Sequence, residues 1–380
     1  VDLTVHKVDS DGSMSEVTRG HGHSCGATFL DTRFLEWVRD RFGDEFYDVC
    51  TEKYPSAMAT LVEKWEGVKR RFSGKEEVEE YMTLPGKIGK AMPEEVETRL
   101  ENMQDDEADD LVLLTEDFKA IFDPVVDEVI ACVVEQFRRL NKSNKREGKH
   151  QGTASASAPK VDVMLLVGGF NASPYLVSRI RDKFRDYAGH IIAPMQPGSA
   201  VVIGAVHYGS RPTLIKSRVS RYSYGVPITT RFDPGNPLHV KHSHRKQWNP
   251  KAEDYWLHKL FAPFVRLGES VPVGMTVERR YFPMYSNQTV VSFQVLQSNQ
   301  KALFTDEPSV QALGDCTSVN VPLTGKKGVT AKMHFGGTEI RIDLIPDDHS
   351  YEAKSVTVQF KSQDGEAEPS TQTGAKADEW

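Results

Sequence analysis

Two neighbouring glycines, Gly168 and Gly169, end the segment whose composition best suits ligand binding. The preceding residues, VDVMLLV, favour a buried strand, and Ser173 followed by Pro174 is typical of a helix N-cap and first turn. Glycines let a ligand approach the backbone at the carboxyl end of such a strand, where the helix N-terminus favours phosphate. The segment therefore suits a nucleotide site, although a tight structural turn between strand and helix explains the same residues.

A helical pattern over residues 56–73 carries groups that could converge on the same ligand. One face is apolar, and a different face bears polar side chains at i, i+3, i+4 and i+7 spacing, namely Glu66, Lys69, Arg70 and Ser73. A solvated helix face is the alternative interpretation. A third pattern, PGSAVVIGAVHYG, places Ala200 and Gly204 four residues apart. It predicts a helix packed closely against another element, or a helix at a hinge between lobes.

Other reactive side chains lack the spacing that known chemistry requires. The two histidine clusters, with His21, His23 and Cys25 in one and His239, His242 and His244 in the other, do not match a zinc motif. The chain has no GxxxxGK[ST] phosphate loop and no GxSxG nucleophile elbow. We therefore expect no metal site and name no catalytic residue.

Composition limits the remaining classes of function. A chain of 380 residues, at about 150 per domain, suggests two or three domains. The net charge of −7 disfavours nucleic acid as a partner, and no apolar run approaches the roughly 18–20 residues that span a membrane. Four scattered cysteines form no disulfide framework. A cytoplasmic location with reduced thiols is the simplest expectation.

Periodicity indicates an α/β region followed by an antiparallel β region. We expect helices over 29–42 and 56–73, and a solvated acidic face or loop over 94–110. Between 115 and 140 we expect a buried helix pair that is divided or kinked at Pro124. Residues 141–160 have the composition of a disordered insertion. Beyond about residue 220, alternating segments between turns predict antiparallel strands, and the last twenty residues predict an unfolded tail.

The first residues predict that the chain is a fragment. VDLTVHKV alternates as a strand does, and it starts at Val1 with no initiator methionine. A folded strand rarely begins at the first residue of a gene product, so we expect further sequence upstream.

Together these stretches resemble the 70-kDa heat-shock chaperones, and most closely their heat shock 70 kDa protein 12 branch. The motifs that carry the resemblance occur in the family's order: VDLTVHKV, GHGHSCGATFLDTRFLEWV, the face with Glu66, LLVGGFNASP and PGSAVVIGAV. The resemblance implies an incomplete actin-like ATPase (ribonuclease H-like) α/β domain over 1–212, a linker over 213–220, a β-sandwich like the peptide-binding domain over 221–361, and a disordered tail over 362–380.

The same resemblance assigns roles to individual residues. ATP or ADP with Mg²⁺ is the implied cofactor, with Glu66, Lys69, Arg70, Ser73, Gly168 and Gly169 at adenosine, Gly26 facing phosphate and Asp2 near the cations. RLGESVPVGMTVERRYFPMYSNQTVVSFQVLQSNQ is similar to the first strands of the peptide-binding domain, which implies a groove near Met284, Gln288, Val291 and Phe293. These four residues are alternatively sandwich core. Unfolded peptides, client proteins and co-chaperones are the implied partners.

The sequence also departs from the family's pattern. Ala172 stands where most members have an arginine against adenine, and Gly198 replaces an acidic residue. The linker SRPTLIKSRVSR lacks the acidic, leucine-rich character of the family's linker, and no helical lid follows. The family's first lobe, with its phosphate loops, would lie upstream of Val1. We therefore expect ATP hydrolysis near background from this chain alone. A non-enzymatic interaction module that acts through its β surface is the alternative function.

Overall fold

The computed structural model divides the chain into two units, Val1–Ile215 and Lys216–Trp380. It describes residues 1–104, 108–146, 160–283, 288–321, 328–335 and 339–359. The division falls inside the expected linker, 213–220. Much of that linker has regular structure, because η2 (Pro212–Leu214) and β7 (Ile215–Val219) occupy it.

The first unit contains three pairs of strands. Antiparallel pairs are formed by β1 (Asp2–Val8) with β2 (Met14–Gly22), and by β3 (Glu79–Thr83) with β4 (Asp110–Leu114). The third pair, β5 (Val161–Leu165) and β6 (Ala188–Ile192), is parallel. Parallel neighbours need a crossover, which the predicted helix α7 (Pro174–Phe184) supplies.

Helices make up most of the rest of this unit. They are α1 (Thr28–Phe42), α2 (Asp44–Lys53), α3 (Pro55–Lys69), α4 (Gly86–Ala91), α5 (Glu94–Met103), α6 (Thr115–Arg146) and α8 (Ala200–Ser210), with a short η1 (Gly169–Ala172). The helix expected over 29–42 is confirmed as α1. The helix expected over 56–73 forms as α3 but ends at Lys69, so Arg70 is its C-cap and Ser73 lies beyond it. Residues 94–103 of the acidic segment form α5, which buries Val96 and Leu100 and leaves its acidic side chains on the solvated face.

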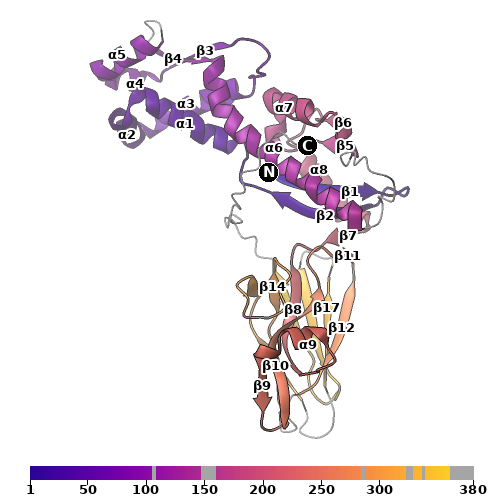
Figure 1. Cartoon of the computed structure of the whole chain (residues 1–380). Coiled ribbons are helices and arrows are strands. Elements are labelled where there is room, and N and C mark those ends of the chain that lie inside the picture. The colour runs from indigo at the N-terminus through magenta and orange to yellow at the C-terminus, as the bar shows by residue number, and fades with distance from the viewer. Residues whose placement is uncertain (105–107, 147–159, 284–287, 322–327, 336–338, 360–380) are drawn as a thin grey trace. The chain divides into compact units, whose positions relative to one another are not determined.

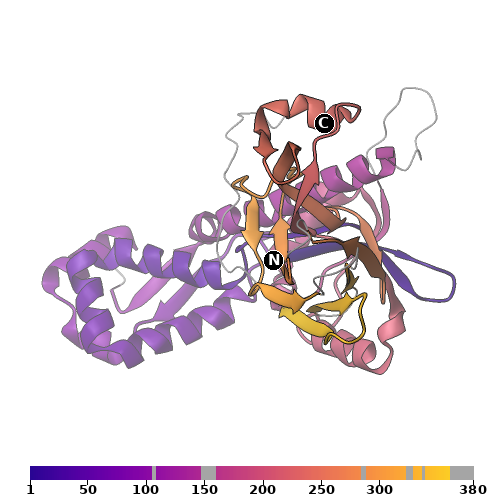
Figure 2. The same cartoon turned by 90° about the horizontal axis from the view of Figure 1, so that it is seen from below.

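The expected helix pair around Pro124 is instead one helix of 32 residues, α6. A proline inside a helix costs about 3 kcal/mol, but Phe122, Val125 and Val126 on either side of it are all buried, and their packing outweighs that cost. The helix also continues to Arg146, so residues 141–146 of the expected disordered insertion are helical. Residues 147–159 lie outside the described part of the chain. Figures 1 and 2 show α6 running along the β1–β2 hairpin.

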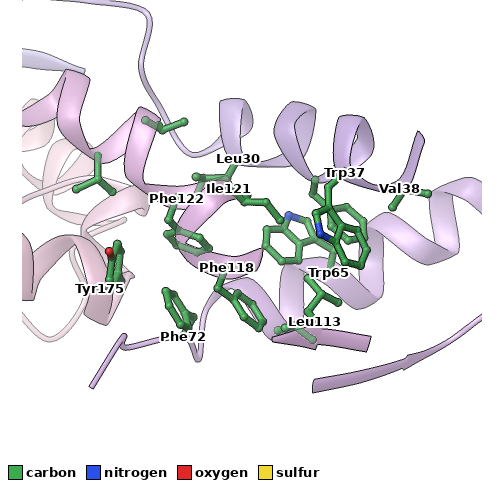
Figure 3. Close-up of a cluster of buried hydrophobic side chains, with 14 of the residues drawn as sticks. Leu30, Trp37, Val38, Trp65, Phe72, Leu113, Phe118, Ile121, Phe122 and Tyr175 are labelled. Carbon is green, nitrogen blue, oxygen red and sulfur yellow. The ribbon is translucent and has the colours of Figure 1, made fainter. Parts of the chain in front are cut away.

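An aromatic cluster fills the core between α1, α3, α6 and α7 (Figure 3). Trp65 stacks on Phe34 with their ring centroids 4.5 Å apart, and Phe72 stacks on Phe118 at 4.6 Å. Phe122 meets Tyr175 edge to face at 5.6 Å. This core fixes the apolar face of α3, so it also fixes the direction in which the charged face of α3 points.

The second unit consists mainly of antiparallel strands, as the alternating segments predicted. One sheet has the order β15-β14-β8-β10-β9, another has the order β12-β17-β18-β19, and two smaller pairs join β13 to β16 and β7 to β11. Hydrophobic side chains from both larger sheets share one core. The bounds are β8 (Ser223–Arg231), β9 (Lys246–Asn249), β10 (Asp254–Val265), β11 (Ser270–Pro272), β12 (Thr276–Tyr281), β13 (Val290–Phe293), β14 (Leu296–Ser298), β15 (Val310–Ala312), β16 (Thr317–Asn320), β17 (Val329–His334), β18 (Glu339–Pro346) and β19 (Lys354–Gln359), with α9 (Pro237–Lys241) and η3 (Ser243–Arg245) between β8 and β9.

Helix α8 forms as predicted, but the close packing expected at its small residues is absent from the described structure. None of its residues is buried, and no atom lies within 4 Å of a Cβ placed on Gly204. Its valines and isoleucine are exposed. Among the described residues, no helix combines the length and the apolar character that crossing a membrane would require.

Candidate functional site

The turn after β5 has the backbone geometry that its glycines predict. Gly168 adopts φ +93°, a conformation that side chains of L-residues disfavour, and its N–H donates to the carbonyl of Pro197 at 2.7 Å. No heavy atom lies within 4 Å of a Cβ placed on Gly168 or Gly169. Ser173 caps α7, because its Oγ accepts a hydrogen bond from the N–H of Leu176 at 3.4 Å. The turn is therefore rigid on one side and open to a ligand on the other.

The charged face of α3 is organised by ion pairs. The Lys69 ammonium is only 7% exposed and contacts Asp31 Oδ1 at 2.6 Å as well as the carboxylate of Glu66. Arg70, with 71% of its side chain exposed, donates to Glu66 Oε1 at 2.8 Å. The hydrogen bond from Lys69, supported by Arg70, holds the pKa of Glu66 below its ordinary value, so this carboxylate remains ionised.

Asp31 is a member of this network that the sequence did not single out. Its carboxylate accepts hydrogen bonds from the Lys69 ammonium and from the Trp65 indole N–H, the latter at 3.0 Å. Lys69 is thus anchored inside the protein and acts by holding Glu66 in place. No local pattern links Asp31 on α1 to α3, since the pairing depends on how the two helices pack.

Tyr175 brings the residues that follow α3 next to the first turn of α7. Its ring lies 4.9 Å from that of Phe72, and a Cβ on Gly74 would clash with it. Figure 3 shows Phe72 between Tyr175 and Phe118. The Tyr175 hydroxyl donates to the Asp123 carboxylate on α6. Ser73, between Phe72 and Gly74, is therefore held beside the start of α7, the helix that follows the Gly168–Ser173 turn.

The residues expected near phosphate and cations, Gly26 and Asp2, form a second group. Gly26 lies half-buried in the loop before α1, and no heavy atom lies within 4 Å of a Cβ placed on it. Asp2 is exposed on β1, opposite Gly22 of β2. Their roles toward a ligand stay predictions.

The residues expected to line a peptide groove have mixed positions. Met284 lies outside the described residues. Gln288 is partly buried and donates from Nε2 to the carbonyl of Val290 at 2.7 Å. Val291 and Phe293 on β13 are buried in the core of the second unit, and the Phe293 ring meets that of Tyr281 at 5.3 Å. Their burial fits the alternative interpretation that these two residues are core.

The second unit also has a hollow of about 610 Å³ that no sequence pattern predicted. Its lining is mixed, with Pro227 and Ile228 beside Thr229, His258 and Lys259 from β8 and β10. An ion pair between Arg245 and Asp306, 2.8 Å long, lies along it. These residues are scattered over the sequence, and no motif connects them.

Comparison with known proteins gives one consistent group of relatives. The chain is 27% identical over 364 residues to Heat shock 70 kDa protein 12A of Homo sapiens and to its counterpart in Mus musculus. It is 25% identical over 371 residues to Heat shock 70 kDa protein 12B of Homo sapiens. Each match covers 91% of this chain and 50% of the relative, so the chain spans about half the length of these curated relatives. No protein-family model matches it.

Proposed function

We propose that this chain, a member of the 70-kDa heat-shock protein family related to its heat shock 70 kDa protein 12 branch, binds an adenine nucleotide through its first unit. The relationship implies an actin-like ATPase fold, and the first unit is a mixed α/β structure. The proposed site is the surface formed by the end of α3 and the Gly168–Ser173 turn.

One observation carries this proposal: the contacts of Tyr175 hold the end of α3 against the start of α7. We infer that the polar face with its ionised carboxylate and the open glycine turn border one site, although about a hundred residues of chain separate them. Ligand sites commonly form where several segments converge on an open, rigid turn.

The side chains suit the two halves of a nucleoside. The ionised Glu66 carboxylate can accept hydrogen bonds from ribose hydroxyls, and Lys69 holds it in position from the protein side. The exposed, planar guanidinium of Arg70 can stack on a purine ring. The bare backbone at Gly168 and Gly169 leaves room for the rest of the nucleoside. Gly26 and Asp2 are the proposed groups near phosphate and Mg²⁺, which would supply positive charge to the phosphates.

Two adjacent arginines provide a matched test. Arg70 pairs with Glu66 and is a proposed site residue, whereas Arg71 pairs with Glu80 on β3, and both side chains are largely exposed. We expect ADP binding to the 380-residue chain, measured by calorimetry, to weaken about tenfold in Arg70→Ala, the effect of losing roughly 1.4 kcal/mol, and to be unchanged in Arg71→Ala. Equal effects of the two variants, or no binding by the unmodified chain at millimolar ADP, would contradict the proposal.

Three features of the site favour a second candidate, an interaction module without nucleotide turnover. Ala172 stands where most family members have an arginine against the adenine, and Gly198 stands in place of an acidic residue before the hinge helix. The charges of Asp31, Glu66, Lys69 and Arg70 neutralise one another within the protein. In that case the β unit would contact unfolded peptides or client proteins, with co-chaperones as further partners.

Thermal unfolding separates the two candidates. A ligand at 100 times its dissociation constant stabilises a protein by about 2.7 kcal/mol, so ADP should raise the unfolding temperature of the first unit if the nucleotide site works. Unchanged unfolding with ADP, together with saturable binding of an extended fluorescent peptide, would favour the interaction module.

A further inference from the structure

Two pairs of metal-ligating side chains, far apart in the sequence, meet beside the β1–β2 hairpin. His23 and Cys25 lie in the loop between β2 and α1, and Glu128 and Cys132 lie one helical turn apart on α6. A ring nitrogen of His23, the Sγ of Cys25 and a carboxylate oxygen of Glu128 all lie within 4.8 Å of one another. A nitrogen, a sulfur and an oxygen donor thus surround one point in space.

The spacing of these donors is close to that of a zinc site. Zinc bonds are about 2.3 Å to sulfur and about 2.0–2.2 Å to nitrogen or oxygen, which places tetrahedral ligand atoms about 3.3–3.8 Å apart. The Nδ1 of His23 and the Oε2 of Glu128 are 3.7 Å apart. Both side chains are about half exposed, at 54% and 55%, so small rotations can bring them onto a shared ion.

The framework that carries the donors is fixed by hydrogen bonds. The N–H of Cys25 donates to the carbonyl of His23 at 2.9 Å, and the N–H of His23 donates to the carbonyl of Val1 at 3.0 Å. Gln136, two turns along α6 from Glu128, donates to the hydroxyl of Thr18 on β2 at 2.7 Å. The loop and the helix therefore keep their relative positions without a bound ion, so a metal would meet a site that is largely formed.

The sulfur of Cys25 is held close to His23 inside the protein. The Cys25 side chain is fully buried, and its S–H donates to the backbone carbonyl of His23 at 3.7 Å. The sulfur donor is therefore fixed on the same loop as the imidazole donor.

We propose that His23, Cys25 and Glu128 bind one zinc ion and leave a fourth position for water. Sulfur, imidazole and carboxylate donors together favour zinc over magnesium or calcium, which prefer oxygen alone. On binding, the Cys25 S–H bond breaks, a zinc–sulfur bond forms, and the proton passes to solvent. The ion ties the β2–α1 loop to α6.

Cobalt(II) is the probe for this site, because its thiolate charge-transfer and tetrahedral d–d absorption bands report the ligands directly. The reduced, metal-free 380-residue chain should bind one equivalent of cobalt with both sets of bands, and zinc should displace it. Cys25→Ser should remove the charge-transfer band. His23→Ala and Glu128→Gln change exposed side chains, so both variants should fold normally. Their zinc affinity, measured by competition with a chelator, should fall at least about 100-fold. This loss is larger than that caused by removing a residue that contacts only a ligand of the metal.

Two control variants exclude the other metal-binding side chains. Cys316→Ser changes the exposed cysteine of the second unit, and His244→Ala changes an exposed member of its histidine cluster. Both variants should keep the cobalt spectrum and the zinc affinity. The proposal is overturned if the charge-transfer band persists in Cys25→Ser, if His23→Ala and Glu128→Gln bind zinc as tightly as the unmodified chain, or if a control variant loses the site.

Discussion

Trp65 should link the stability of the first unit to the geometry of the proposed nucleotide site. Its indole is fully buried, stacks on Phe34 at 4.5 Å and on Phe118 at 6.0 Å, and donates to Asp31 at 3.0 Å. Replacing a buried tryptophan by alanine costs about 3–5 kcal/mol through lost contacts and a cavity. Trp65→Ala should therefore remove much of the stability of a unit that, like most domains, has only about 5–15 kcal/mol to lose.

Trp65→Phe isolates the polar part of this effect. A hydrogen bond to a charged acceptor contributes about 1.5–3 kcal/mol, and Asp31 keeps its second partner, Lys69, when the indole is gone. We therefore expect a loss near the lower limit, about 1.5–2 kcal/mol. Because the Glu66–Lys69–Asp31 pairs remain, nucleotide binding by Trp65→Phe should change little.

Urea unfolding followed by the helical band of circular dichroism is the appropriate assay. Nearly all helices belong to the first unit, so this band reports its unfolding separately from that of the β unit. Trp248→Phe is the control, because Trp248 is exposed on β9 of the second unit, and it should shift the helical transition by less than about 0.5 kcal/mol. A loss below about 1 kcal/mol for Trp65→Ala would refute the packing described for α3.

Two further predictions concern single contacts. Gly74 has φ +68°, and a Cβ at this position would clash with the ring of Tyr175. Gly74→Ala should therefore lower the free energy of unfolding, measured from the helical transition, by at least about 1–2 kcal/mol. Gly86→Ala places its Cβ in open space, so it should leave this free energy unchanged or raise it. In the second unit, hydrogen bonds from Arg280 and from a backbone N–H lower the pKa of Asp347. The stability from this carboxylate is therefore present above about pH 3.9 and lost as the pH falls through its lower folded-state pKa. Asp347→Asn should make unfolding of the β unit less sensitive to acid over that range, and unchanged sensitivity would contradict the assignment.

Features set by neighbouring residues could be predicted from the sequence. The Gly168 turn and the Ser173 cap depend on backbone freedom and on one local hydrogen bond, and both form as expected. The division into two helices that was one expectation at Pro124 did not occur, because the rule for proline is local whereas burial of the flanking side chains is tertiary. The role of Asp31 could not be predicted from the sequence either, because its partner Lys69 lies on another helix and their pairing depends on tertiary packing.

The proposed zinc site shows why spacing rules alone could not find it. Zinc motifs are recognised when two ligands lie a few residues apart and a second such pair follows at a characteristic distance. His23 and Cys25 form one pair, but Glu128 and Cys132 lie about a hundred residues further on, at the i, i+4 spacing that aligns side chains on a helix. Neither pair alone indicates a metal site in the sequence. They become one candidate site because the part of α6 that follows Pro124 carries Glu128 and Cys132 and the helix packs along the β1–β2 hairpin, a tertiary contact that no local pattern reveals.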